Sequence, residues 1–159
     1  MPEIQNTDGD FNEVKARLYD IFCYDFFHSP ITFSDLEVWV DRRIIEDEYE
    51  EGFWHLTTKK DHETGERLFD PRRAERLHWC RVILESSEDP EVKVFDYDEF
   101  TSKGVKTRTY VWLENFNYVI VLEKRNVGTK DIYFLITAYY VSYSSSRRKL
   151  NKKMKRSKS

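Results

Sequence analysis

The sequence predicts an α+β fold, in which a twisted antiparallel sheet carries helices packed largely on one face. Three observations support this prediction. Apolar residues recur at helical spacing in two segments, one near the N-terminus and one in the middle of the chain. The last third of the chain holds three segments rich in β-branched and aromatic residues, joined by short polar links that favour an antiparallel meander. A chain of 159 residues, 40% of them hydrophobic, is also long enough to bury one core.

Both long helices have clear start signals. Asp10 is placed to cap a helix over residues 11–27, and Asp70 precedes Pro71 at the start of a helix over residues 71–85. We expect both helices to pack on the sheet through their apolar stripes.

The strands are predicted from alternating apolar residues and from the turn residues between them. A continuous apolar run, Val119 to Leu122, indicates a central strand that is covered on both faces. The charged segment 42–51 is expected to form either a short helix or an acidic loop. The expected strands cover residues 31–33, 36–40, 53–58, 91–97, 107–114, 118–124 and 132–143.

Charge is unevenly distributed along the chain. Residues 147–159 hold eight Lys and Arg and no acidic residue, so residues 1–146 carry a formal charge of −11 within the total of −3. We therefore divide the chain into one domain, residues 1–146, and a short basic C-terminal helix or tail. Such a segment favours RNA or another acidic partner, although a solubilising extension explains it equally well.

The cysteines and the hydropathy pattern predict the compartment. Cys23 and Cys80 both fall in predicted helices, which favours free thiols in a reducing compartment over a disulfide framework. No run approaches the ~18 apolar residues of a membrane span, and the N-terminus lacks an apolar signal core. We therefore expect a cytoplasmic protein with no membrane association.

His55 is the strongest candidate for chemistry. Alternation along the predicted strand 53–58 places His55 and Thr57 on one face, toward a cleft. Histidine can act as a general base or acid near neutral pH, but a lone histidine is more often structural. Neighbouring cations favour a functional role, because arginine side chains and helix N-terminal amides together suit phosphate. These cations, for which a plain surface helix is the alternative, are Lys59, Lys60, Arg67, Arg72, Arg73 and Arg76.

A second candidate group lies on the last predicted strand. Thr137 and Tyr139 share one face, where they can bind a phosphate or stack on a base, although residues at the edge of a core show the same pattern. The histidines and cysteines match no zinc-site spacing, and the chain has no phosphate-binding glycine loop. We therefore expect no metal and no cofactor.

Three stretches together resemble a superfamily of metal-independent ribonucleases, the barnase, EndoU, colicin and RelE-like group. They are FWHLT (53–57), DPRRAER (70–76) and TAYY (137–140), and they look most like its small phage and bacterial toxin members. The resemblance covers about residues 11–149 and includes the order of helices and strands. It implies cleavage of RNA by the neighbouring 2′-hydroxyl, which leaves a cyclic phosphate and needs no metal.

The resemblance implies a role for each candidate residue. His55 would act as acid or base, and Arg73 and Arg76 would hold the scissile phosphate and stabilise its added charge. Thr137 would hydrogen-bond to that phosphate, and Tyr139 would assist or stack on a base. The implied substrate-binding residues are Thr57, Lys59, Lys60 and Arg72. The candidates for the second proton transfer are Tyr139, Lys59 and His62.

Two other functions fit the same residues. One is a non-catalytic RNA- or protein-binding module of the same fold, which would use the arginine helix and the basic tail. The other is an interaction protein, such as a toxin neutraliser, whose acidic segment 46–51 mimics nucleic acid. The expected partners are RNA and, for a toxin, a protein antitoxin or inhibitor.

Overall fold

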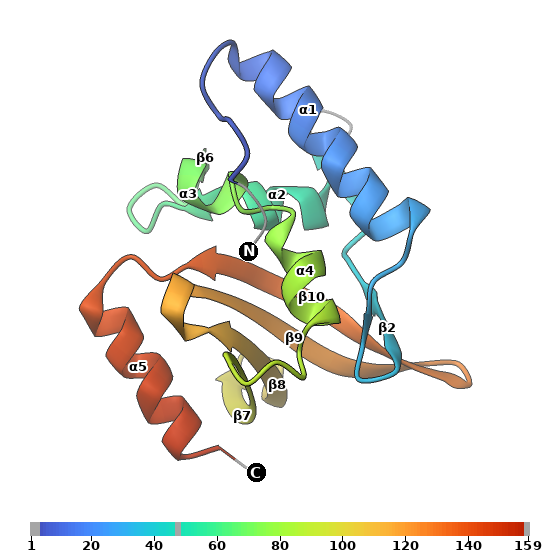
Figure 1. Ribbon diagram of the computed structural model, residues 1–159, viewed down its shortest axis with the longest axis vertical. Helices are drawn as coiled ribbons and strands as arrows, with labels where there is room; N and C mark the ends of the chain where they lie inside the picture. Colours follow the sequence, from blue (N-terminus) through green and yellow to red (C-terminus); the bar gives the residue numbers. More distant parts are fainter. Residues whose placement is uncertain (1–3, 47–48, 158–159) are drawn as a thin grey trace.

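A computed structural model describes residues 4–46 and 49–157, and one six-stranded sheet lies at its centre (Figure 1). The helices are α1 (Phe11–Cys23), α2 (Glu51–Thr57), α3 (Pro71–Ala74), α4 (Trp79–Glu85) and α5 (Ser144–Lys155), with a π-helical segment η1 (Tyr24–His28) and a 3₁₀ turn η2 (Glu114–Phe116). The strands are β1 (Thr32–Phe33), β2 (Leu36–Trp39), β3 (Ile44–Glu46), β4 (Tyr49–Glu50), β5 (Thr58–Lys60), β6 (Arg67–Phe69), β7 (Val92–Thr101), β8 (Gly104–Leu113), β9 (Tyr118–Val127) and β10 (Lys130–Tyr140).

The sheet has the order β1-β2-β10-β9-β8-β7. The meander from β7 to β10 is antiparallel throughout, which confirms the prediction from the short links. The pairing of β2 with β10 is parallel, however, so the sheet is mixed rather than wholly antiparallel. The two strands lie far apart in the sequence. Patterns among neighbouring residues therefore cannot predict this pairing.

Helices cover both faces of the sheet unequally (Figure 1). The larger core packs α1, α2 and α4 against one face, and it includes Leu18, Phe53, Ile83 and Ile120. The smaller core lies on the other face, where Leu150 of α5 joins a group of sheet residues that includes Trp112 and Val119. The α+β architecture, with most helices on one face, is confirmed.

The basic C-terminal segment forms a docked helix. Leu150 is only 3% exposed, and Met154 packs against the same core. Lys153 Nζ lies 2.7 Å from Glu99, and Arg147 Nη2 lies 3.0 Å from Glu114. The helix starts at Ser144 and spans the predicted boundary at residue 146, while Lys158 and Ser159 lie outside the described residues.

The strand predicted over residues 53–58 is wrong. Residues Glu51–Thr57 form α2, and the strand β5 starts only at Thr58. Phe53, Leu56 and Thr57 fall at helical spacing and are all buried, so this short stretch satisfies both periods. The helix also starts close to the preceding chain, since a Cβ atom on Gly52 would lie 2.9 Å from Val40 Cβ and 3.1 Å from the main-chain oxygen of Asp41.

Two further elements differ from the prediction. The helix expected over residues 71–85 is two short helices, α3 and α4, separated by a turn. The segment 42–51, expected as a helix or an acidic loop, contains the paired strands β3 and β4, while Asp47 and Glu48 lie outside the described residues. None of the described helices is long and apolar enough to cross a membrane.

Candidate active site

His55 lies on α2 beside an acidic partner. Its Nε2 atom is 3.0 Å from Oε1 of Glu51, one helical turn earlier, and the side chains are 24% and 15% exposed. The Nδ1 atom is buried and makes no hydrogen bond to the described residues. A partly exposed imidazole held by a carboxylate is a common arrangement for proton transfer.

The surroundings of His55 lower its pKa below 6.5. Burial has the largest effect, and the positive charge of Arg67 lowers the pKa further. Glu51 and Asp41 oppose this shift, because their negative charges favour the protonated ring. The imidazole is therefore neutral at pH 7, which is the form that a general base requires.

Two substitutions should move the pKa of His55 in opposite directions. Glu51→Gln should lower the pKa, because it removes a charge that stabilises the imidazolium, and Arg67→Met should raise it by removing a repelling charge. An NMR titration of the histidine ring protons measures both changes. Glu88→Gln, an exposed change of charge away from this group, serves as the control and should leave the pKa of His55 unchanged.

Arg73 joins three separate segments of the chain. Its Nη1 donates to the main-chain oxygens of His55, at 3.1 Å, and Thr58, at 2.7 Å. Its guanidinium lies 5.8 Å from the ring centre of Tyr139 on β10. Burial lowers the pKa of Arg73, and its Nη2 makes no hydrogen bond among the described residues. Arg73 thus holds α2 in position, and its Nη2 remains available to donate a hydrogen bond.

The side chain of Arg76 contacts several other residues of the protein. Its Nη1 donates to the main-chain oxygen of Arg72, at 2.8 Å, and to Glu75, at 2.6 Å. The guanidinium also lies 4.4 Å from the ring centre of Tyr140 and 5.3 Å from that of Trp79. These contacts hold α3, α4 and β10 together.

Thr137 and Tyr139 lie on the face of the sheet that carries α5. They pair with Val121 and Val119 of β9, and Val119 belongs to the smaller core. Burial raises the pKa of Tyr139, so its hydroxyl stays protonated over a wide pH range. Both residues stand on one face as the sequence predicted, and only Tyr139 is seen to meet another candidate residue, Arg73.

Thr57, expected to face a cleft, is buried. Its hydroxyl donates to the main-chain oxygen of Phe53 within α2, at 3.0 Å. The expected outward position followed from the strand assignment, which the helix replaces.

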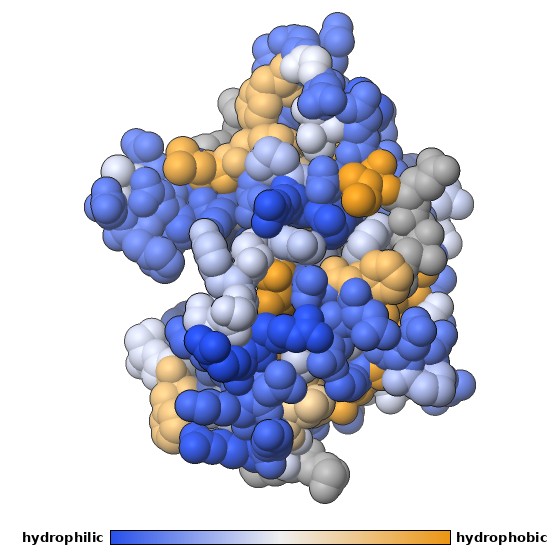
Figure 2. All heavy atoms as spheres, turned by 60° about the vertical axis from the view of Figure 1, so that its left-hand side comes forward, coloured by the Kyte–Doolittle hydropathy of each residue, from blue (hydrophilic) through white to orange (hydrophobic). Residues whose placement is uncertain are grey.

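Lys59, Lys60 and Arg72 come together in an open groove of about 950 Å³ between the β5–β6 hairpin and the start of α5. Figure 2 shows this face, with an indentation between the hairpin and α5. His62, Phe69 and Tyr143 also contribute to the lining, and Tyr143 is 65% exposed. The acidic residues of the lining include Asp61 and Asp70, whose carboxylates accept hydrogen bonds from their own turns.

Sequence reasoning missed Glu51, and it placed Arg67 only among the cations near His55, without its effect on the pKa of that residue. Glu51 stands four residues before His55, and this spacing brings two side chains together only on a helix. Arg67 lies on β6, which pairs with β5 directly after α2. Glu51 becomes recognisable as the partner of His55 once the segment 51–57 is assigned as helical.

Among the described residues, no three His, Cys, Asp or Glu side chains are grouped so that they could hold a metal ion. Comparison of the chain with protein-family models, curated proteins and solved structures gives no match.

Proposed function

We propose that this protein is a metal-independent endoribonuclease that acts on RNA in the cytoplasm. The observation that carries the proposal is the convergence on Arg73, which bonds to the main chain of His55 and stacks near Tyr139. These three residues come from α2, α3 and β10, and the resemblance to metal-independent ribonucleases implies a catalytic role for each of them. Toxin-type members of that group suggest a protein antitoxin or inhibitor as a further partner.

In the proposed reaction, neutral His55 carries its proton on the buried Nδ1, and its Nε2 takes the proton from the 2′-hydroxyl of the substrate. The oxygen attacks the adjacent phosphorus, the bond to the 5′-oxygen breaks, and a 2′,3′-cyclic phosphate forms. Glu51 stabilises the resulting imidazolium, and Arg73 offers its Nη2 to the added negative charge. The leaving oxygen takes a proton from Tyr139, Lys59 or His62.

The groove beside the β5–β6 hairpin supports RNA as the substrate. Single-stranded nucleic acid is typically held by cations that contact phosphates and by aromatic rings that stack on bases. The groove offers Lys59, Lys60 and Arg72 as cations, and the exposed ring of Tyr143 as a stacking surface. Its position next to α5 continues the cationic surface along that helix.

The outer face of α5 is expected to contribute to RNA affinity. Arg148, Lys149, Lys152 and Lys155 are exposed and form no ion pair with other described residues. Changing all four to Gln should weaken RNA binding and reduce the salt slope, log Kd against log[salt], by up to about 3. Fluorescence anisotropy of a labelled single-stranded RNA at several salt concentrations measures this slope.

Substitution is the appropriate test for α5, because deletion of residues 147–159 would remove Leu150 and uncover part of the smaller core. The control is Lys103→Gln with Lys106→Gln, which removes two cations at the far end of the sheet. An unchanged salt slope in the α5 variant would mean that the outer face of the helix does not contact RNA.

A non-catalytic RNA-binding module of the same fold is the second candidate. It is favoured by the internal use of Arg73 and Arg76, whose Nη1 atoms both bond within the protein. The deciding experiment is RNA cleavage in EDTA by the wild type and a His55 variant. Cleavage by the wild type alone supports the nuclease, whereas binding without cleavage supports the module.

A further inference from the structure

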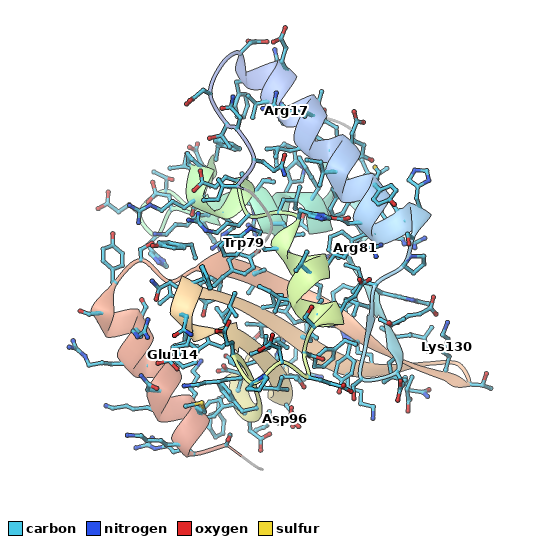
Figure 3. The ribbon with its side chains drawn as sticks, in the orientation of Figure 1. Arg17, Trp79, Arg81, Asp96, Glu114 and Lys130 are labelled. Atoms are coloured by element: carbon cyan, nitrogen blue, oxygen red, sulfur yellow. The ribbon has the colours of Figure 1, made fainter. Side chains whose placement is uncertain are left out.

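The central sheet divides into two arms at one end. β8 and β9 pair with each other only from Thr109–Leu122 to Leu113–Tyr118. Beyond this region, residues 104–108 pair only with β7, and residues 123–127 pair only with β10. We call the space between these two half-strands the fork. Figure 3 labels Asp96, which lies on β7 at the base of the fork, and Lys130 at the end of the β9–β10 arm.

Each side of the fork is an unpaired strand edge. In an antiparallel strand, alternate residues direct both their N–H and C=O groups toward one neighbour. Half-strands 104–108 and 123–127 have a neighbour on one side only, so part of their main chain faces the fork without a strand partner. Such edges can accept an extended peptide as an added strand.

The fork is also basic. A cavity of about 710 Å³ lies in it and is lined by Lys103, Lys106, Arg108, Lys124 and Arg125, with one acidic residue, Glu123. Glu123 pairs with both arginines, at 3.0 Å and 2.9 Å. The three lysines form no ion pair with other described residues.

A second cavity of about 500 Å³ opens beside the first and shares Lys106, Glu123 and Lys124 with it. Its lining includes Asp96, whose carboxylate accepts a hydrogen bond from the Thr109 hydroxyl at 2.7 Å. The charge left available to a partner at the fork is therefore positive.

We propose that the fork binds an extended acidic peptide segment of a partner protein, which adds as a strand along its free edges. The unpaired main chain would supply the strand hydrogen bonds, and Lys106 and Lys124 would pair with acidic side chains. A second copy of this chain is disfavoured, because two basic edges repel each other.

RNA is disfavoured at the fork for a different reason. Single-stranded nucleic acid is typically held by aromatic rings that stack on bases as well as by cations, and no aromatic side chain is among the described residues that line the larger cavity. The smaller cavity contains only Tyr133, whose ring already packs against Phe33 at a centre distance of 5.1 Å. This interaction surface is separate from the proposed nuclease groove and does not depend on that function.

The test uses the full-length protein and a fluorescent peptide of alternating Val and Glu, ten residues long. A matched peptide carries N-methyl groups on alternate residues, so that it keeps its charge but cannot complete the strand hydrogen bonds. We expect the Lys106→Glu, Lys124→Glu double variant and the N-methylated peptide each to weaken binding by at least about tenfold. Hydrogen exchange at residues 104–108 and 123–127 should slow when the unmodified peptide binds.

The control is Arg148→Glu with Lys152→Glu on α5, which should leave peptide affinity within about twofold because the helix lies outside the fork. If the fork variant unfolds, Lys106→Gln with Lys124→Gln replaces it. Absence of saturable binding, or equal binding of both peptides, would overturn the proposal. Loss of RNA affinity instead of peptide affinity in the fork variant would also overturn it and assign the fork to nucleic acid.

Discussion

His55→Ala should lower the rate of RNA cleavage by at least about 100-fold, because it removes the proposed general base. The side chain is partly exposed, and Glu51 is the one partner of its ring among the described residues, so the melting temperature should change little. Arg73 contacts the main-chain oxygen of His55, and that contact survives the substitution. The measurement is single-turnover cleavage of a labelled RNA oligonucleotide, with thermal melting of the same samples.

The matched control is His28→Ala, which removes an exposed histidine of η1. It should retain full activity. A His55→Ala enzyme that cleaves at the rate of wild type would remove His55 from the mechanism and leave its pairing with Glu51 as a structural feature of α2.

Asp25→Ala should destabilise the protein by about 3 kcal/mol, because it breaks a buried ion pair and leaves its partners unsatisfied. Asp25 is only 1% exposed, and its carboxylate lies 2.7 Å from His78 Nδ1 and 3.2 Å from Arg81 Nε. Arg81 Nη2 also donates to the main-chain oxygen of Asp25, at 3.1 Å. These bonds join η1 to α4, and Figure 3 labels Arg81 beside that junction.

The expected cost is at the lower end of the range for buried pairs, because Arg81 keeps its contact with Glu85 and His78 is one-third exposed. Urea unfolding measures the free energy directly. Asp20→Ala, an exposed change one turn earlier in the same helical segment, should cost no more than about 0.5 kcal/mol. Equal costs for the two variants would show that the buried network contributes little to stability.

Local sequence signals predicted the elements that depend on neighbouring residues. Asp70 caps α3 as expected, since its carboxylate accepts from the main-chain N–H groups of Arg72 and Arg73. The turn between β9 and β10 contains Gly128 with a positive φ of 67°, which fits its place in a tight link. The meander follows from such turns, because short links permit only antiparallel neighbours.

Long-range contacts were not predictable in the same way. The parallel pairing of β2 with β10 joins segments about a hundred residues apart, and no local pattern encodes it. The stretch from Phe53 to Thr57 satisfies both strand and helix spacing, so its conformation is decided by packing against the core. Because this stretch was predicted as a strand, the pairing of Glu51 with His55, which needs helical spacing, was not predicted.

The most direct test of the account is the chemistry of the RNA ends produced by purified protein in EDTA. We predict 2′,3′-cyclic phosphate and 5′-hydroxyl ends from the wild type, and no such ends from His55→Ala. A substrate with 2′-deoxy residues should resist cleavage, because it lacks the attacking hydroxyl. Fragments with 3′-hydroxyl ends, equal cleavage by both proteins, or no cleavage by the wild type would contradict a metal-independent ribonuclease centred on His55.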